Sequence, residues 1–365
     1  MENEMYFCSQ CGVVLNETEC FHFGENIYCR SCLSEETVVC IHCGERILNE
    51  DNRNTACDPV CSECFNEHYT YCYECDRVIS YDDAIMGEDD NDYCPECYNR
   101  IYNRPIHGYN FKPEPIFYGE GKRYFGVEIE IDKGGECDEN AEELLETANR
   151  DKEHIYIKHD GSLYDGMEIV THPMTLDYHI NTMNWDEIAK RALSLDYRSH
   201  ETSTCGFHIH VNRDSFSDIC TEREEHIANV FYLVEKFWDQ LLIFSRRTEE
   251  QLSRWASRYG CEADPKDVYK RVKENYYGRY KCINDQNEAT IEFRIFRGTL
   301  KTNTIIATLQ MVNEICNVAV SMSEKELQDL NWDELVDRLH VYPELMVYLN
   351  ERGLINIENV QKEKE

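Results

Sequence analysis

Residues 123–132 read RYFGVEIEID, in which apolar and acidic side chains alternate. This period of two predicts a strand whose valine and isoleucines point to one face while Glu128 and Glu130 point to the other. Two carboxylates on one strand face repel each other, so they are stable either in solvent or with a cation between them. Taken alone, this strand leaves both interpretations open.

Three further segments alternate in the same way: 154–172 (HIYIKHDGSLYDGMEIVTH), 205–212 (CGFHIHVN) and 290–299 (TIEFRIFRGT). The first predicts a hairpin with Asp-Gly turns, which places Asp160 and Glu168 on either side of the turn. The second predicts a strand with His208 and His210 on one face, between apolar residues. Two such histidines are either structural side chains or metal ligands.

The last segment predicts a strand in which Glu292 and Arg294 share a face and Arg297 follows at the end. The glutamate and an arginine could form only a cross-strand ion pair. If all four strands lie in one sheet, however, one face holds several carboxylates, an imidazole and arginines. Carboxylates are ligands for Mg²⁺ or Mn²⁺, and arginine grips phosphate, so this face predicts phosphoryl-transfer chemistry.

The N-terminal third is an internal repeat of cysteine pairs. Of the 20 cysteines, fourteen lie between residues 8 and 97 and include six CxxC pairs, of which the first, third and fifth begin 32 residues apart. Each unit of CxxC, a spacer of 17 or 18 residues and CxxC predicts a four-thiolate zinc site. The predicted zinc ligands are Cys8, Cys11, Cys29, Cys32, Cys40, Cys43, Cys61, Cys64, Cys72, Cys75, Cys94 and Cys97.

A module of about 32 residues is too small to hold a core unaided, so we expect three structural zinc ions. Cys20, His22, His42 and Cys57 are left over and could replace a ligand or take part in a cross-braced pairing. The units resemble zinc ribbons or LIM-type fingers. That resemblance implies docking of a partner rather than chemistry, because a closed four-thiolate site has no open position.

Composition sets limits on partners and compartment. The formal net charge is −34, and residues 1–100, with 5 basic and 22 acidic residues, carry −17 of it. Such acidity argues against nucleic-acid binding and against adhesion to anionic membranes. No secretory signal and no stretch of roughly 20 apolar residues is visible, so we expect a cytoplasmic protein without a membrane span.

The expected organisation follows from the repeat and from a cluster of prolines after it. We expect three zinc modules within residues 1–100 (5–36, 37–68 and 69–100), a linker at 101–118, a globular domain at 119–355 and a frayed tail at 356–365. Apolar residues at helical spacing predict scaffold helices in 218–246 and 303–321.

The four motifs FGVEIE, KHDGSLYDGMEIVTHP, CGFHIHVN and TIEFRIFRGT, in this order, resemble the amidoligase family. Its members are glutamine synthetase-like carboxylate–amine ligases associated with phages and bacteria. The resemblance covers about 118–325. It implies an α+β fold, a curved antiparallel sheet with helices on one face, and ATP-dependent phosphorylation of a carboxylate followed by attack of an amine.

The resemblance also assigns roles to individual residues. It implies that Mg²⁺ or Mn²⁺ is held by Glu128, Glu130, Glu168, His208 and Glu292. It implies that ATP and phosphate are contacted by His208, His210, Arg294, Arg297 and, more weakly, Arg279, and that Asp160 belongs to the second acidic pair. The expected substrates are a carboxylate and an amine acceptor, either of which can be a peptide or protein.

Two alternatives keep the same fold. The chain could be an inactive zinc-finger adaptor, or a phosphotransferase that acts on a guanidino group. A cupin-like oxygenase fits less well, because no third histidine stands at suitable spacing. Cys205, beside the histidine strand, is a candidate nucleophile only if a suitable partner activates its thiol.

Overall fold

The computed structural model describes residues 5–87, 89–102, 104–260, 264–274 and 280–355. The chain divides into two compact units, Met1–Arg104 and Pro105–Glu365. The tail 356–365, for which fraying is expected, lies outside the described residues. Each unit has its own buried clusters, so each is described by itself.

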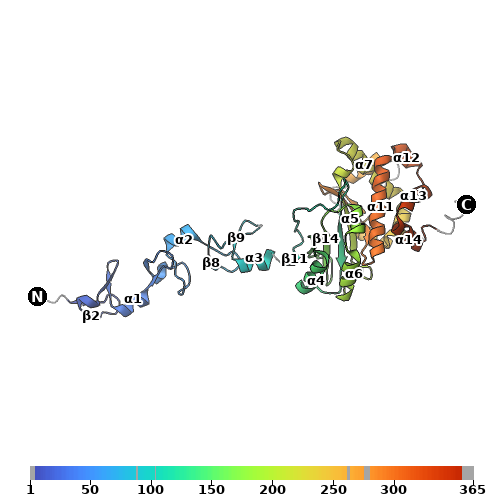
Figure 1. The fold of residues 1–365 in the computed structure, drawn as a ribbon. Helices are drawn as coiled ribbons and strands as arrows, with labels where there is room; N and C mark the ends of the chain where they lie inside the picture. The colour runs from blue at the N-terminus through green and yellow to red at the C-terminus, as the bar shows by residue number, and fades with distance from the viewer. Residues whose placement is uncertain (1–4, 88, 103, 261–263, 275–279, 356–365) are drawn as a thin grey trace. The chain divides into compact units, whose positions relative to one another are not determined.

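The first unit repeats a two-stranded hairpin followed by a short helix (Figure 1). The first module contains β1 (Tyr6–Phe7), β2 (Val14–Leu15), β3 (Phe21–Phe23), β4 (Asn26–Tyr28) and α1 (Arg30–Glu36). The second contains β5 (Thr37–Val39), β6 (Arg46–Leu48) and α2 (Ser62–His68). The third contains β7 (Tyr69–Tyr71), β8 (Val78–Ser80), β9 (Ile85–Met86), β10 (Asp92–Tyr93) and α3 (Pro95–Tyr102).

The cores of these modules consist largely of cysteine. Few apolar side chains join them, namely Leu15 and Tyr28 in the first module, Val60 in the second, and Ile79 and Tyr93 in the third. By contrast, the residue before the first cysteine pair of each module is 58%, 42% and 48% exposed, at Phe7, Val39 and Tyr71 respectively. So little buried apolar area cannot offset the chain entropy of folding, which is why a metal is expected at each centre.

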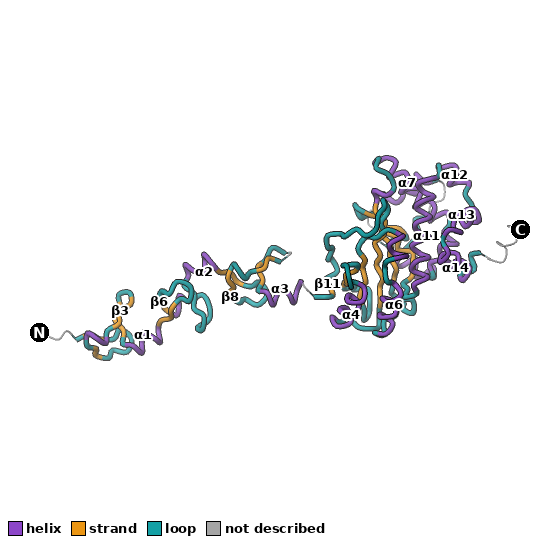
Figure 2. The backbone as a smooth tube through the Cα atoms, in the orientation of Figure 1, coloured by secondary structure: helices purple, strands orange, loops and turns teal. Residues whose placement is uncertain are grey.

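The second unit is built on a seven-stranded sheet with the order β11-β13-β14-β12-β15-β17-β16 (Figure 2). Its strands are β11 (Ile106–His107), β12 (Phe125–Ile131), β13 (Ile155–Lys158), β14 (Met167–Thr171), β15 (Gly206–Asn212), β16 (Ile283–Asn284) and β17 (Thr290–Arg297). All four strand motifs of the sequence therefore share one sheet. The hairpin predicted in 154–172 is the antiparallel pair β13–β14.

The sheet is mixed rather than wholly antiparallel, which corrects the expectation at one edge. Strand β11 pairs with β13 in parallel, with Ile106 opposite Ile157. The segment 101–118, for which a linker is predicted, thus contributes a strand to the sheet. The end of this segment is also bonded to the rest of the second unit, where the Tyr118 N–H donates to the carbonyl of Pro173 over 2.9 Å.

Helices accompany the sheet in this unit. They are α4 (Asp138–Ala148), α5 (Leu176–Asn181), α6 (Trp185–Ser194), α7 (Cys220–Lys236), α8 (Trp238–Ser245), α9 (Glu249–Trp255), α10 (Pro265–Glu274), α11 (Thr302–Ser321), α12 (Glu324–Asp329), α13 (Trp332–Arg338) and α14 (Pro343–Glu351). The segment 218–246 forms α7 and α8 instead of one helix, because the backbone leaves the helical region at Phe237.

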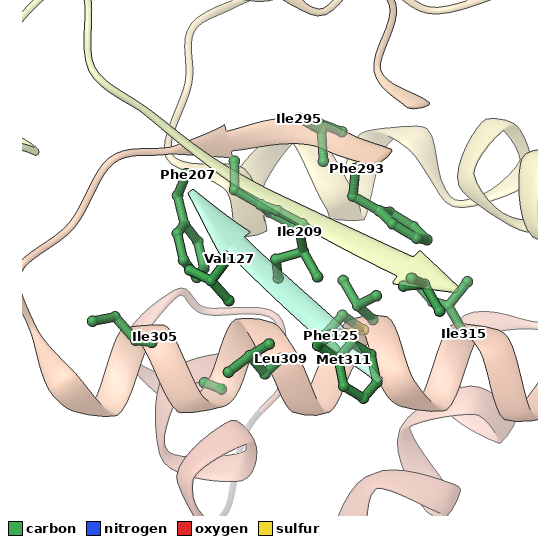
Figure 3. Close-up of a cluster of buried hydrophobic side chains, with 14 of the residues drawn as sticks. Phe125, Val127, Phe207, Ile209, Phe293, Ile295, Ile305, Leu309, Met311 and Ile315 are labelled. Carbon is green, nitrogen blue, oxygen red and sulfur yellow. The ribbon is translucent and has the colours of Figure 1, made fainter. Parts of the chain in front are cut away.

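Helix α11 runs along the core side of the sheet (Figure 3). Leu309 and Ile315 of the helix meet Val127 and Ile209 of the strands in one continuous cluster of buried side chains. The helix is long and apolar enough to cross a membrane, yet 78% of its apolar window is buried inside the protein. It is therefore accounted for as the central core helix of this unit.

A β-bulge in β17 changes the simple alternation near its end. Phe207 and Ile209, two residues apart on β15, lie opposite Phe296 and Phe293, three apart on β17. The extra residue turns Phe296 toward the core, where it is 2% exposed, and puts Arg297 opposite Gly206, on the polar face. Strict alternation would have sent Arg297 into the core.

Candidate active site

Cross-strand pairing gathers the polar residues of the four motifs on one face of the sheet. Glu128 of β12 lies opposite His208 of β15, and Glu130 lies opposite Glu168 of β14. His210 lies opposite Glu292 of β17. Because directly opposite side chains in an antiparallel pair are close neighbours, this register places carboxylates and imidazoles in contact.

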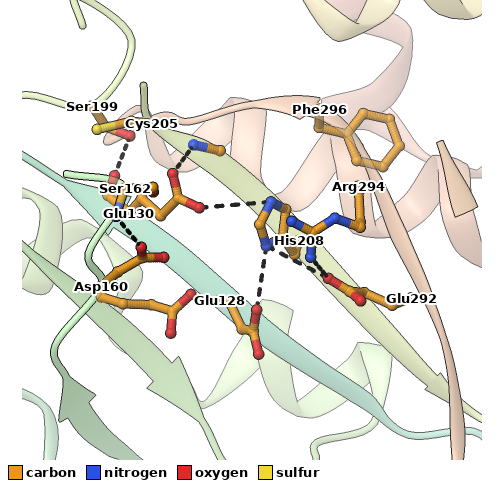
Figure 4. A network of polar contacts seen from close by, with 12 residues as sticks. Glu128, Glu130, Asp160, Ser162, Ser199, Cys205, His208, Glu292, Arg294 and Phe296 are labelled. Atoms are coloured by element: carbon orange, nitrogen blue, oxygen red, sulfur yellow. Dashed lines mark hydrogen bonds and ion pairs between the residues drawn. The ribbon is translucent and has the colours of Figure 1, made fainter. Parts of the chain in front are cut away.

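His208 lies at the centre of this group, between three carboxylates (Figure 4). Its Nδ1 is 3.2 Å from an oxygen of Glu128 and 3.7 Å from one of Glu292, while its Nε2 is 3.7 Å from Glu130. Glu130 also accepts a 2.5 Å hydrogen bond from the backbone N–H of Gly206. Three of these four side chains, those of His208, Glu130 and Glu292, are nearly inaccessible to water, so their charges interact strongly.

The pKa values of these carboxyl groups are shifted in different directions. Burial raises the pKa of Glu168 well above its usual range, and the neighbouring Glu128 raises it further. Burial raises the pKa of Glu130 as well. For Glu128, burial acts in the same direction, but His210 and His208 outweigh it and lower the pKa well below the usual value. Without a cation, burial and crowding therefore favour the protonated forms of Glu168 and Glu130, and a bound cation would stabilise their ionised forms.

Two sets of side chains can hold such a cation. The ligand atoms of Glu128, Glu168 and His208 all lie within 4.8 Å of one another, and so do those of Glu128, His210 and Glu292. His210 fits a ligand role because its buried Nε2 lies 3.2 Å from an oxygen of Glu128, a member of the same set. Carboxylate oxygens with one imidazole suit Mg²⁺ or Mn²⁺.

A cavity of about 470 Å³ opens beside this cluster. Glu130 and His208 line it from the sheet, and Asp160 lines it from the loop after β13. The backbone N–H of Ser162 donates to Asp160 over 2.7 Å, which holds that carboxylate in a tight turn. Trp255 at the end of α9 adds an aromatic wall. The cavity thus joins the acidic cluster to space for a ligand.

The predicted arginines occupy different places. Arg294 lines the cavity and forms an ion pair with Glu292. Arg297 instead donates to the backbone carbonyl of Thr202 over 3.1 Å and is not among the residues that line the cavity. Arg279 lies outside the described residues.

Two cationic residues of this region have no role assigned to them by the sequence analysis. Lys158, directly opposite Glu168, is 8% exposed and lies 3.6 Å from its carboxylate. Arg247 follows helix α8 and lines the cavity although no motif contains it. The one sequence signal is the pair Arg246-Arg247 directly after an apolar helix, which does not by itself reveal where the helix ends in space.

Cys205 does not fit a nucleophile. It is 3% exposed, and burial raises the pKa of its thiol to about 12, so it is protonated at neutral pH. Its thiol donates to the backbone carbonyl of Arg198 over 3.9 Å, and its backbone N–H donates to the hydroxyl of Thr202. A protonated, enclosed thiol is a structural residue.

The cysteine sets of the first unit converge as their spacing predicts. The four sulfurs of each sequential set lie within 4.8 Å of one another, in the groups Cys8/Cys11/Cys29/Cys32, Cys40/Cys43/Cys61/Cys64 and Cys72/Cys75/Cys94/Cys97. Sulfur–sulfur distances of 3.9 to 4.0 Å link the first and second pairs. These distances are close to the edge of a tetrahedron with zinc–sulfur bonds of about 2.3 Å.

Backbone groups prepare these thiols for a metal. The N–H of Cys29 points at the sulfur of Cys8 over 3.3 Å, and the N–H of Cys61 at that of Cys40 over 3.4 Å. Hydrogen bonds from backbone N–H groups, that of Cys11 foremost, lower the pKa of Cys8 to about 6. Three clusters of this kind are compatible with three zinc ions.

A protein-family model matches a large part of the second unit. Residues 137–316 match the model of a family described as "Putative amidoligase enzyme". No curated protein matches the chain.

Two solved structures are similar to part of the chain. One is a bifunctional glutathione synthetase from Pasteurella multocida, with 12% identity and a TM-score of 0.32 over 63% of this chain and 46% of that chain. The other is the complex between the prokaryotic ubiquitin-like protein Pup and its ligase PafA, with 9% identity and a TM-score of 0.31 over 64% of this chain and 62% of that chain. This chain therefore spans less than two thirds of the length of either protein.

The family match begins after β12, so it rests on residues other than Glu128 and Glu130. It includes the loop of Asp160, the strand of His208 and the strand of Glu292. These elements converge on one polar face in an α+β unit, and the likeness that the four motifs predict is thereby confirmed: the second unit of this chain resembles the amidoligases.

Proposed function

We propose that this protein is an ATP-dependent ligase that joins a carboxylate to an amine through an acyl phosphate. The observation that carries the proposal is the shared polar face, where carboxylates, two histidines and Arg294 surround one edge of the cavity. Phosphoryl transfer needs cations beside the nucleotide and arginine beside the moving phosphoryl group, and this face offers places for both.

The acidic cluster would hold two divalent cations, one on Glu128, Glu168 and His208 and one on Glu128, His210 and Glu292. When bound, Mg²⁺ or Mn²⁺ neutralises the β- and γ-phosphates of ATP. Arg294, on the cavity wall, donates to the transferring phosphoryl group as the substrate carboxylate attacks it. Asp160 faces the same space, where its carboxylate binds the ammonium form of the second substrate and accepts a proton from it. The neutral amine then attacks the acyl carbon, and phosphate leaves.

The zinc modules would dock the protein or peptide that carries one substrate. Their acidity supports a basic or polar partner, since residues 1–100 carry half of the net charge on fewer than a third of the residues. Closed four-thiolate sites leave no coordination position for catalysis, which favours a binding role. We place this activity in the cytoplasm, where cysteines remain reduced and available to zinc.

The proposal is tested by incubating the zinc-loaded protein and ATP with a lysate of its source cells, followed by mass spectrometry. The expected result is ADP release together with a product whose mass equals two lysate components minus one water. Glu128→Ala and Glu292→Ala should abolish both signals while zinc content and circular dichroism remain unchanged. Unchanged turnover in both variants contradicts the assignment.

Two measurements distinguish this proposal from the alternatives. A phosphorylated guanidino compound in place of an amide identifies a phosphotransferase on this fold. Absence of Mg·ATP or Mn·ATP binding by the intact protein in calorimetry, with partner binding retained, identifies an adaptor.

A further inference from the structure

Four arginines surround the end of strand β17. Arg294 and Arg297 belong to the strand, and Arg246 and Arg247 follow helix α8. Among the described residues, Arg294 alone of the four forms an ion pair with a carboxylate, that of Glu292. The other three guanidinium groups are held mainly by neutral backbone carbonyls, so this corner of the fold has an excess of positive charge.

The turn after α8 orients Arg247. Helix α8 ends at Arg246, which adopts a left-handed conformation with φ of 63°. The Arg246 guanidinium donates to the carbonyl of Arg297 over 2.6 Å, and the Nε of Arg247 donates to the carbonyl of Phe296 over 3.2 Å. Both bonds attach the turn to the bulged end of β17, and they leave the Nη groups of Arg247 available to the cavity that this residue lines.

Gly206 shows how close Arg247 comes to the acidic cluster. A Cβ atom at Gly206 would lie 2.8 Å from Nη2 of Arg247, 2.6 Å from Nε2 of His208 and 3.3 Å from Oε1 of Glu130. The guanidinium therefore shares one small space with two groups of the candidate metal site. Only glycine leaves room for all three side chains at this point.

The position is unfavourable for an arginine without an anion. Arg247 is 8% exposed, and burial lowers its pKa to about 10, although Glu130 opposes this effect. It remains charged at neutral pH, and the neighbouring Arg294 and Arg297 repel it. A buried charge without an ionic partner destabilises the fold unless a ligand supplies the opposite charge.

We propose that Arg247, together with Arg294, binds the phosphoryl oxyanion in this cavity. The inference rests on the proposed function, which it deepens by assigning the γ-phosphate to the side of the cavity formed by Arg247 and Arg294. The substrate carboxylate oxygen forms a bond to the γ-phosphorus as the bond from that phosphorus to the bridging oxygen breaks, and the bridging oxygen leaves with ADP. Arg247 donates to non-bridging oxygens before and after this transfer.

The test compares nucleotides that differ in the γ-phosphate. The zinc-loaded full chain is titrated in a calorimeter with a non-hydrolysable ATP analogue and with ADP, each with excess Mg²⁺. Arg247→Met should weaken binding of the ATP analogue about 10- to 100-fold, because a charge-assisted bidentate contact is lost, and should change ADP binding less than about threefold. Arg247→Lys should give an intermediate loss, since lysine keeps the charge without the planar fork.

Arg191→Met is the matched control. It removes an arginine that pairs with Glu143 on the helical surface, and it should leave both affinities unchanged. Circular dichroism verifies folding of every variant. If Arg247→Met fails to fold, the discrimination between the ATP analogue and ADP in Arg247→Lys decides the question.

An equal loss for both nucleotides, or no loss for either, overturns the role of Arg247. If the unmodified protein binds neither nucleotide, the proposed function fails, and inorganic phosphate then tests the arginine by itself. Phosphate binding that disappears in Arg247→Met supports an oxyanion site that serves another phosphorylated ligand. Failure of phosphate to bind overturns the inference too.

Discussion

Glu128 and His208 lie directly opposite each other on strands β12 and β15, with the imidazole Nδ1 3.2 Å from the carboxylate. The other oxygen of the same carboxylate is 3.2 Å from Nε2 of His210. Glu128 therefore joins the two histidines and belongs to both sets of candidate metal ligands. Its two carboxylate partners, Glu168 and Glu292, each belong to one of these two sets.

This shared position predicts different metal stoichiometries for different glutamates. Glu128→Gln should abolish Mn²⁺ binding at the sheet, because both sets lose a ligand, and weaken affinity at least about 100-fold. Glu292→Gln and Glu168→Gln should each leave one ion bound. Titration of zinc-loaded protein with Mn²⁺, followed by electron paramagnetic resonance, counts the ions.

Glu142→Gln serves as control because Glu142 is exposed on helix α4. It should bind as many ions as the unmodified protein. Retention of two ions by Glu128→Gln would show that the cluster is not the metal site.

Metal removal should unfold the modules without unfolding the sheet. The cysteine-rich cores of the first unit are too small to be stable without a metal, whereas the second unit buries a large apolar cluster of its own. We expect three zinc ions per chain by elemental analysis and two in Cys40→Ser. Hydrogen exchange after chelation should show lost protection in residues 5–102 and preserved protection in α11.

Cys57→Ser is the matched control for this experiment. Cys57 is exposed and lies outside the three clusters. Zinc content of three in this variant supports the sequential sets, and a fall to two would indicate a different pairing.

Acid should destabilise the second unit through His179. This residue is completely buried, its ring bonds the carbonyl of Phe125, and burial lowers its pKa from 6.5 to about 4. The unfolded chain then binds a proton between these two pKa values while the folded chain does not, so stability is full above pH 6.5 and falls as the pH falls toward 4. The shift corresponds to about 3 kcal/mol of unfolding free energy.

Urea denaturation at a series of pH values measures this effect. His179→Gln should lose less stability than the unmodified protein over that pH range. His340→Gln, at an exposed position, should follow the unmodified protein. Identical pH profiles for all three would exclude His179 as the cause.

Gly166 should tolerate no side chain. A Cβ there would lie 2.0 Å from the carbonyl oxygen of Ile131, at the point where the loop of Asp160 returns to strand β14. Gly166→Ala should therefore destabilise the protein by about 1–3 kcal/mol or more and displace Asp160. Thermal unfolding measures the first effect. Gly108→Ala, where nothing lies within 4 Å, should change stability little.

Much of the polar face could be predicted because strand alternation is local. In RYFGVEIEID and CGFHIHVN, each side chain's face follows from its parity within the strand, whatever strand pairs with it. The three cysteine sets could be predicted for a similar reason. A spacing of two residues within a pair and of 17 or 18 between pairs is short enough to bring four sulfurs around one point.

Other features could not be predicted, because they depend on contacts between distant segments. The bulge in β17, which turns Arg297 onto the polar face and Phe296 into the core, arises only from pairing with β15. Strand β11 joins the sheet edge in parallel through Ile106, in a segment rich in prolines that reads as a linker.

The amino-acid sequence by itself therefore determined the faces of the strands and the composition of the cysteine sets, since both follow from short-range periodicity. Only the tertiary structure decided which residues share a space. Arg247 comes to lie beside Glu130 and His208 because a left-handed turn ends α8 against the bulged strand. This proximity depends on the order and packing of elements far apart in the chain, so local sequence patterns do not predict it.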